Sequence, residues 1–124
     1  MAKSILIVDD SATMTLSVKS SLEMNGFVVQ AASDGLKAVA KLKDGYKPDL
    51  IITDINMPNM DGLELIKAVK GMPGFRFTPI LTLTTEGDSA KRDQGKKLGA
   101  TGWMVKPISG QDLVKVVRQV LPGA

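Results

Sequence analysis

Short runs of apolar residues recur along the chain, and most of them contain no alternating polar positions. Such runs are typical of strands that are buried on both faces of a parallel sheet, where neither face meets water. On this pattern we predict five strands, over residues 5–8, 27–29, 50–52, 80–83 and 103–105.

Between the strands, apolar residues recur three or four positions apart, which places them on one face of a helix. The expected apolar stripes are Met14, Val18 and Leu22; Leu36, Val39 and Ala40; Leu63, Ile66 and Val69; and Leu113, Val116, Val117, Val120 and Leu121. Turn and capping residues bound these segments, namely Asn25 and Gly26, Asp34 and Gly35, Asp61 and Gly62, Ser109, and Pro122 and Gly123. We therefore predict four amphipathic helices at these places.

The segment 89–98 is rich in charged side chains and has little apolar content, so its pattern alone does not predict a helix. A parallel sheet, however, needs a crossover before its last strand, and we expect a helix there for that reason. Alternating strands and helices of this kind give an α/β protein of (βα)5 type, a doubly wound sandwich around a parallel sheet. Of the two common strand orders, we expect the flavodoxin-like order 2-1-3-4-5, in which strands one and three are neighbours.

The composition limits the chemistry that the chain can perform. Its 124 residues suffice for a single domain, spanning 1–124, and they include neither cysteine nor histidine. The absence of both residue types excludes disulfides, thiolate metal sites, thiol nucleophiles and imidazole catalysis. Any chemistry must therefore use carboxylates, lysine, hydroxyl groups, backbone groups and hard cations.

The charge and hydropathy of the chain indicate where it works. The net charge of +3 is small and is not gathered in a tail, so it gives no argument for nucleic-acid binding. The longest strictly aliphatic run, residues 5–8, is much shorter than a membrane span or the core of a signal peptide. We expect a soluble, cytoplasmic monomer that binds neither nucleic acid nor membrane.

Acidic residues follow two of the predicted strands, at the edge where doubly wound sheets bind ligands. Asp9 and Asp10 follow the first strand, and Asp54 follows the third, with Asn56 two residues further on. Neighbouring parallel strands are roughly 4.8 Å apart, so the carboxylates converge and repel one another unless a proton or a cation binds. An all-oxygen site with few protein ligands suits Mg²⁺.

A hydroxyl group and a lysine follow the two last strands near the same edge. Thr84 follows the fourth strand, and Lys106 follows the fifth and supplies a point charge for a phosphoryl group. An acidic metal site, one lysine and one hydroxyl group suit the positioning and charge stabilisation of a transferring phosphoryl group, with an aspartate as the nucleophile.

With these motifs in this order, the whole chain resembles the receiver domain of bacterial response regulators, in particular the stand-alone receivers of chemotaxis. The motifs are Asp9-Asp10, Asp54-Ile55-Asn56-Met57-Pro58 with Asp61-Gly62, Thr84, and Lys106-Pro107. Each motif alone is weak, but their joint occurrence at strand ends is specific. The resemblance implies a phosphorylation-controlled interaction module, not an enzyme proper, that catalyses its own phosphotransfer and slow autodephosphorylation.

The resemblance also implies how the carboxylates divide their roles. Asp54 would accept the phosphoryl group from a phosphohistidine of a histidine kinase. Asp10 and Asp54 would bind Mg²⁺ together with the backbone carbonyl of Asn56, and Asp9 would act mainly through metal-bound water.

Four further residues receive a role from the same resemblance. Thr84 and Lys106 would bind the phosphoryl oxygens. Trp103 stands where the family usually has Tyr or Phe, an aromatic residue that swings inward when the threonine moves, so Thr84 and Trp103 would form the switch. Glu86 would flank the path of the hydrolytic water, as would Asn56.

Basic residues gather on the segments of the fourth and fifth expected helices, namely Lys91, Arg92, Lys96, Lys97, Lys115 and Arg118. They form either an ordinary solvated face or a docking surface for an acidic partner segment. The resemblance places binding of the output protein on this face of helix 4, strand 5 and helix 5, and it implies a histidine kinase as phosphodonor and a phosphatase as a further partner.

Alternative functions stay open at this point. Control of the flagellar motor in chemotaxis is the expected output, but a stand-alone receiver also fits another phosphorelay. A Mg²⁺-dependent phosphatase of the haloacid-dehalogenase kind has a second acid two residues after its nucleophile, where this chain has Ser11. A flavodoxin-type cofactor carrier would need a hydroxyl- and glycine-rich phosphate loop after strand one, and the two carboxylates there repel phosphate.

Overall fold

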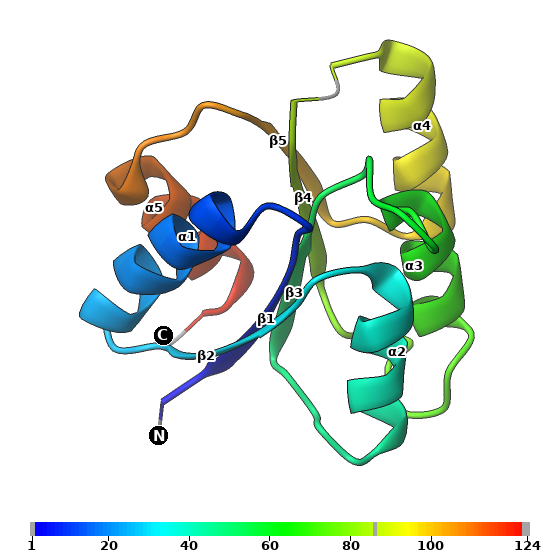
Figure 1. Cartoon of the computed structure of the whole chain (residues 1–124), viewed down its shortest axis with the longest axis horizontal. Helices are drawn as coiled ribbons and strands as arrows, with labels where there is room; N and C mark the ends of the chain where they lie inside the picture. The colour runs from blue at the N-terminus through cyan, green and yellow to red at the C-terminus, as the bar shows by residue number, and fades with distance from the viewer. Residues whose placement is uncertain (1, 86, 123–124) are drawn as a thin grey trace.

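A parallel sheet covered by helices on both faces forms the chain, as a computed structural model shows for residues 2–85 and 87–122 (Figure 1). The strands are β1 (Ser4–Val8), β2 (Val28–Ala32), β3 (Leu50–Thr53), β4 (Ile80–Thr84) and β5 (Gly102–Val105). The helices are α1 (Ala12–Met24), α2 (Gly35–Lys43), α3 (Gly62–Lys70), α4 (Ser89–Leu98) and α5 (Gly110–Val120).

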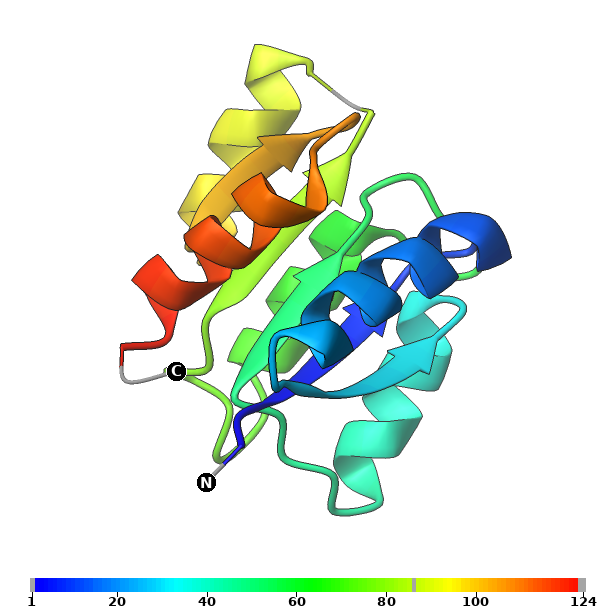
Figure 2. The same ribbon diagram turned by 90° about the vertical axis from the view of Figure 1, so that its left-hand side faces the viewer.

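The strands lie in the order β2-β1-β3-β4-β5, and every neighbouring pair is parallel. This confirms the predicted fold class and strand order. Figure 2 shows the strands running side by side with their arrowheads toward one edge of the sheet. Val8 of β1 is in register with Thr53 of β3, so the residues that follow, Asp9 and Asp54, leave the sheet next to each other.

Two separate cores hold the helices to the sheet. The core beneath α1 and α5 includes Ile7, Leu22, Ile52, Leu83, Leu113 and Val117. The core beneath α2 and α3 includes Leu6, Val8, Leu42, Ile51, Ile66 and Val69. Successive residues of the central strands alternate between these cores, which is why apolar residues predominate on both faces of these strands. In Figure 1, α1 and α5 lie on one side of the sheet and α2, α3 and α4 lie on the other.

The edge strand β2 starts later and ends later than the apolar pattern predicts. The backbone N–H of Phe27 donates to the carbonyl of Leu22 in α1, so Phe27 belongs to the turn. The strand instead continues through Gln30 and Ala31, which pair with β1. Because β2 is at the edge of the sheet, polar and small residues are tolerated there, and these weaken the strand signal in the sequence.

The expected apolar stripe of α2 was wrong. Leu36 is 52% exposed, and Ala38 and Leu42 face the core instead. Ala38 and Leu42 are four residues apart, whereas Leu36 is two residues from Ala38 and therefore lies on the opposite side of the helix. The other three expected stripes supply buried residues of their helices, but they omit Leu65 of α3 and Val114 of α5, which are buried as well. Gly123, expected to help end the last helix, lies outside the described residues.

The polar segment 89–98 does form a helix, as the topology requires. Asp88 caps it by accepting hydrogen bonds from the backbone N–H groups of Ala90 and Lys91, and Gly99 ends it in a left-handed conformation with φ of 116°. All residues of α4 are described, and Gly95 alone among them is buried.

Within residues 2–85 and 87–122, no helix is both long and apolar enough to cross a membrane.

Gly62 begins α3 where the chain passes closest to the end of β3. A Cβ atom at this position would overlap the backbone oxygen of Asp54 and would lie 2.8 Å from the Cα of Ile55. We expect Gly62→Ala to lower the free energy of unfolding by about 1–3 kcal/mol, because backbone atoms have to move. Urea unfolding measures this, with Gly71→Ala as the control, since a Cβ there meets other atoms only at 3.6 Å. Equal stabilities of the two variants would contradict the prediction.

Candidate functional site

Asp9, Asp10 and Asp54 meet at the carboxyl edge of the sheet. The backbone N–H of Asp9 donates to Ala32 of β2 over 3.1 Å, and that of Asp54 donates to Val8 of β1 over 2.8 Å. Each strand is thereby extended by one bonded residue, which fixes the backbone of both aspartates. One carboxylate oxygen from each of the three residues lies within 4.8 Å of the others. The structure therefore brings together all three predicted carboxylates.

The turn after β1 is held by two local hydrogen bonds. The backbone N–H of Ser11 donates to Oδ1 of Asp9 over 2.8 Å, and the Ser11 hydroxyl accepts from the N–H of Met14, which caps α1. Asp9 is buried at 7% exposure, whereas Asp10 is exposed. The side chain of Asp10 is therefore the one of the three that meets solvent most freely.

Lys106 lies between two of these carboxylates. Its Nζ donates to Oδ2 of Asp9 over 2.9 Å and to Oδ2 of Asp54 over 3.0 Å. Burial by itself lowers the pKa of the Lys106 ammonium, but the hydrogen bonds and charges of Asp9 and Asp54 outweigh it, so the pKa is raised above its ordinary value. Lys106 thus supplies the positive charge that partly offsets the repulsion among the carboxylates.

Thr84 and Lys106 are linked through the backbone at the ends of β4 and β5. The N–H of Lys106 donates to the carbonyl of Thr84 over 2.8 Å, and the Lys106–Pro107 peptide bond is cis. Thr84 is fully buried, while Asn56 is exposed in the loop that joins β3 to α3. Glu86 lies outside the described residues.

The donor chemistry of this edge fits a hard divalent cation. Three carboxylates face one ammonium group, so two negative charges remain uncompensated among these four residues. Mg²⁺ prefers oxygen ligands and keeps several of its own waters, which agrees with a small acidic cluster that has one exposed member. The residues present therefore form a candidate Mg²⁺ site.

A family model for the response regulator receiver domain matches residues 5–118 of the chain. The chain belongs to the response regulator receiver family. It is similar to chemotaxis protein CheY1 of Helicobacter pylori (strain ATCC 700392 / 26695), with 38% identity over 118 residues that cover 94% of this chain and 95% of the relative. This confirms the family that the motifs indicated.

Two other relatives show how far the likeness extends. The chain is 37% identical to transcriptional regulatory protein CpxR of Escherichia coli (strain K12) over 94% of its own residues, but it spans only 48% of that protein. Among solved structures, chemotaxis response regulator CheY4 of Vibrio cholerae has a TM-score of 0.92 and 43% identity, covering 98% of this chain and 100% of that one. The receiver fold is therefore shared over nearly the whole chain.

Trp103 of this receiver domain rests against α4. It is partly buried on β5, and a Cβ added to Gly95 would lie 2.9 Å from Cζ3 of its indole ring. A cavity of about 310 Å³ opens beside the ring, bordered by Arg92, Asp93, Lys96, Ala100, Thr101, Gly102 and Trp103. The absence of a side chain at Gly95 thus leaves space for the ring. The sequence did not predict this contact, because no motif relates the two residues.

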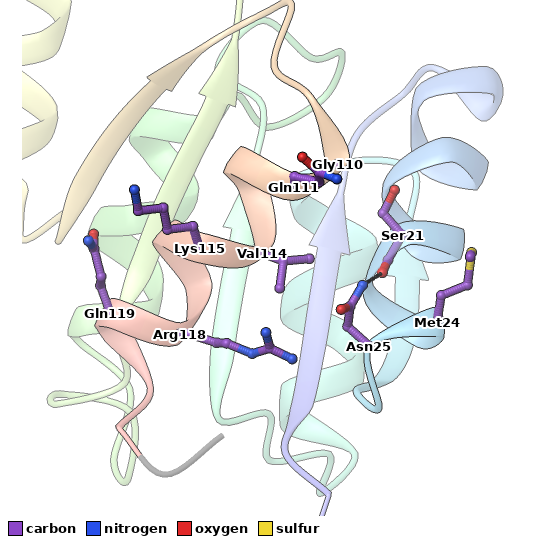
Figure 3. Close-up of a pocket in the computed structure, with 9 residues that line it drawn as sticks. All are labelled: Ser21, Met24, Asn25, Gly110, Gln111, Val114, Lys115, Arg118 and Gln119. Atoms are coloured by element: carbon purple, nitrogen blue, oxygen red, sulfur yellow. Dashed lines mark hydrogen bonds between the residues drawn. The ribbon is translucent and has the colours of Figure 1, made fainter.

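A larger groove of the receiver domain lies away from the carboxylates. It has a volume of about 660 Å³ and runs between α1 and α5, with Val114 at its floor and Arg118 reaching from α5 toward Asn25, which directly follows α1 (Figure 3). The side-chain amide of Asn25 donates to the carbonyl of Ser21 over 2.8 Å, which fixes one wall. The groove includes none of the acidic residues, so it is separate from the candidate metal site.

Lys106→Met should tighten Mg²⁺ binding to the receiver domain. The ammonium group occupies oxygens of Asp9 and Asp54 that a cation would use, so its removal strengthens the negative potential of the cluster. We expect the dissociation constant to fall by about tenfold at low ionic strength, measured by titration calorimetry. Lys97→Met, which removes the same charge from exposed α4, is the control. Weaker binding by the Lys106 variant would show that the lysine supports the metal site instead of competing with it.

Gly95→Ala should displace the indole ring of Trp103 from α4. The new methyl group would approach Cζ3 too closely, and a ring at the edge of the sheet moves more easily than a helix backbone. We expect iodide to quench Trp103 fluorescence about twofold more strongly in the variant, while the circular dichroism stays unchanged. Trp103 is the one tryptophan of the chain, so the emission has a single source. Unchanged quenching would show that α4 moves and the ring does not.

Proposed function

We propose that the chain is a phosphorylation-activated response regulator of a two-component pathway, in which Asp54 accepts a phosphoryl group from a histidine kinase. The observation that carries this proposal is the setting of Asp54 at the end of β3. Its Oδ1 accepts from the N–H of Ile55 over 2.6 Å, and its Oδ2 lies 3.0 Å from Lys106 Nζ, with Asp9 and Asp10 alongside. An oriented carboxylate beside a cation and a metal site suits nucleophilic attack on phosphorus.

The transfer requires one bond to form and one to break. An oxygen of the ionised Asp54 carboxylate bonds to phosphorus while the P–N bond to the kinase imidazole breaks, and the imidazole leaves with the electron pair. Lys106 then places its charge against the phosphoryl oxygens, and Thr84 offers its hydroxyl group to them. Hydrolysis reverses the modification when water attacks phosphorus and the P–O bond to Asp54 breaks, releasing inorganic phosphate.

Asp9, Asp10 and Asp54, with the backbone carbonyl of Asn56, would hold Mg²⁺ during this reaction. When bound, the ion neutralises negative charge on the transferring phosphoryl group. Both chemical steps act on the domain itself, so we interpret it as an interaction module that catalyses its own phosphotransfer and slow autodephosphorylation, and not as an enzyme with an external substrate.

The output surface in this proposal is the face formed by α4, β5 and α5. Lys96 and Lys97 of α4 are exposed there, and Val105 of β5 is 44% exposed. A face that offers both basic side chains and an exposed apolar residue suits a partner segment that carries acidic and apolar residues. Phosphorylation would change the affinity of this face through Thr84 and Trp103. A histidine kinase donates the phosphoryl group, and a phosphatase is a further partner.

We place the protein in cytoplasmic chemotaxis signalling, with control of the flagellar motor as its output. This assignment is supported by the relatives named for chemotaxis, since CheY1 is 38% and CheY4 43% identical to the chain. A receiver in another phosphorelay is the second candidate, because the acidic site is equally suited to it. An assay of motor rotation in cells that carry the Asp54→Asn variant separates these two.

Incubation with a small phosphodonor such as phosphoramidate and Mg²⁺ should give one base-labile phosphoryl adduct on Asp54. Asp54→Asn should lower its formation by at least about 10³-fold, because the amide is a poor nucleophile. Asp44→Asn is the control, since Asp44 is an exposed residue at the end of α2. Intact-mass spectrometry and peptide mapping measure the adduct. An adduct on Ser11 or Thr84, or steady turnover of a phosphomonoester, would contradict the receiver function and favour a phosphatase.

A further inference from the structure

Asp34 is a buried carboxylate outside the acidic cluster, and both of its oxygens accept hydrogen bonds. It is 4% exposed. Its Oδ1 accepts from the backbone N–H of Lys37 over 2.9 Å, which caps α2, and its Oδ2 accepts from Nδ2 of Asn59 over 2.9 Å. The hydrogen bond from Lys37 and then that from Asn59 hold the pKa of Asp34 below its usual value, so the carboxylate is ionised at neutral pH.

The partner of this carboxylate, Asn59, belongs to the loop that leads from Asp54 to α3. Asn59 has a positive φ of 67°, in the left-handed region that Asn tolerates better than other non-glycine residues. The same loop supplies the carbonyl of Asn56, two residues after Asp54. A conformation of this kind persists where contacts from outside the loop determine it.

A second contact joins the same two loops. The backbone N–H of Gly35 donates to the carbonyl of Met60 over 3.3 Å. A Cβ on Gly35 would lie 2.7–2.9 Å from atoms of Met60, so the close approach of the loops depends on glycine at this position. Asp34 and Gly35 together therefore hold residues 59 and 60 against the start of α2.

The two ends of the loop are held to each other. The N–H of Gly62 donates to the carbonyl of Ile55 over 2.8 Å, directly after Asp54. The segment between these two points is short, and the contacts with Asp34 and Gly35 lie in its middle. Its path past the carboxylate cluster is thus set from outside by the β2–α2 turn.

We infer that Asp34 is a positioning residue for the metal site, acting through its hydrogen bond to Asn59 on the loop that carries Asn56. This inference rests on the proposed function, because it assigns Asp34 and Asn59 to the binding of Mg²⁺ there. Asp34 touches neither the cation nor the phosphoryl group. It fixes the loop before the cation arrives, so less conformational freedom is lost on binding.

Three variants test the inference by Mg²⁺ titration calorimetry. Asp34→Ser keeps a hydroxyl that can cap α2 but loses the second acceptor, and Asn59→Gly keeps the left-handed backbone but loses the amide. We expect each to raise the Mg²⁺ dissociation constant by about tenfold, and the double variant to raise it no further. Hydrogen exchange of the peptide covering 56–62 should become faster in all three.

Asp61→Ser is the matched control, because Asp61 caps α3 from the same loop and accepts from Glu64 of its own helix. It removes the same charge as Asp34→Ser, and we expect its Mg²⁺ affinity to stay within about twofold of the original. Urea unfolding verifies that all variants are folded. The inference would be overturned if Asn59→Gly bound Mg²⁺ with the original dissociation constant, or if the two substitutions weakened Mg²⁺ binding additively in the double variant. Failure of the unaltered protein to bind Mg²⁺ would instead overturn the proposed function.

Discussion

The convergence of like charges at one edge of the sheet is the constraint on which the site depends. Because β1 and β3 are parallel neighbours in register, Asp9 and Asp54 have to emerge side by side. Their repulsion is offset by Lys106, which arrives from β5 although β4 lies between β5 and β3. A long, flexible side chain is needed to span that distance, and lysine provides a compact charge at its end. The strand order brings the carboxylates together, and the lysine at the end of β5 reduces the repulsion that results.

The sequence predicted the elements whose signals are local and the site residues that topology alone brings together. Unbroken apolar runs located the central strands, and Asp9, Asp54 and Lys106 stood out because each follows a strand. The edge strand and the stripe of α2 were less predictable, since partial exposure permits several patterns there. The bond between Asp34 and Asn59 could not be foreseen, because the two residues are 25 positions apart and each is an ordinary turn former.

Helix α4 is stabilised by its capping residues and by one aromatic ring more than by buried apolar side chains of its own. The capping Asp88 and the left-handed Gly99 define its limits, and Trp103 packs against Gly95 in between. Elements with few buried apolar contacts open more readily than the rest of a domain. Trp103 lies on β5, the strand that leads to Lys106, and the backbone N–H of Lys106 donates a hydrogen bond to the carbonyl of Thr84. A continuous series of contacts thus runs from the carboxylates to α4.

The contact between Lys106 and Asp9 joins residues that are 97 positions apart in the chain. Because the chain is synthesised from its N-terminus, Asp9 and Asp54 leave the ribosome long before Lys106 does. Until β5 docks, the carboxylates lack their counter-charge, and the nascent sheet has an exposed edge at β4. Loop closure over such a separation is slow to occur by chance. Assembly of the acidic site therefore coincides with completion of the sheet, so an unfinished or truncated chain lacks the lysine that balances its carboxylates.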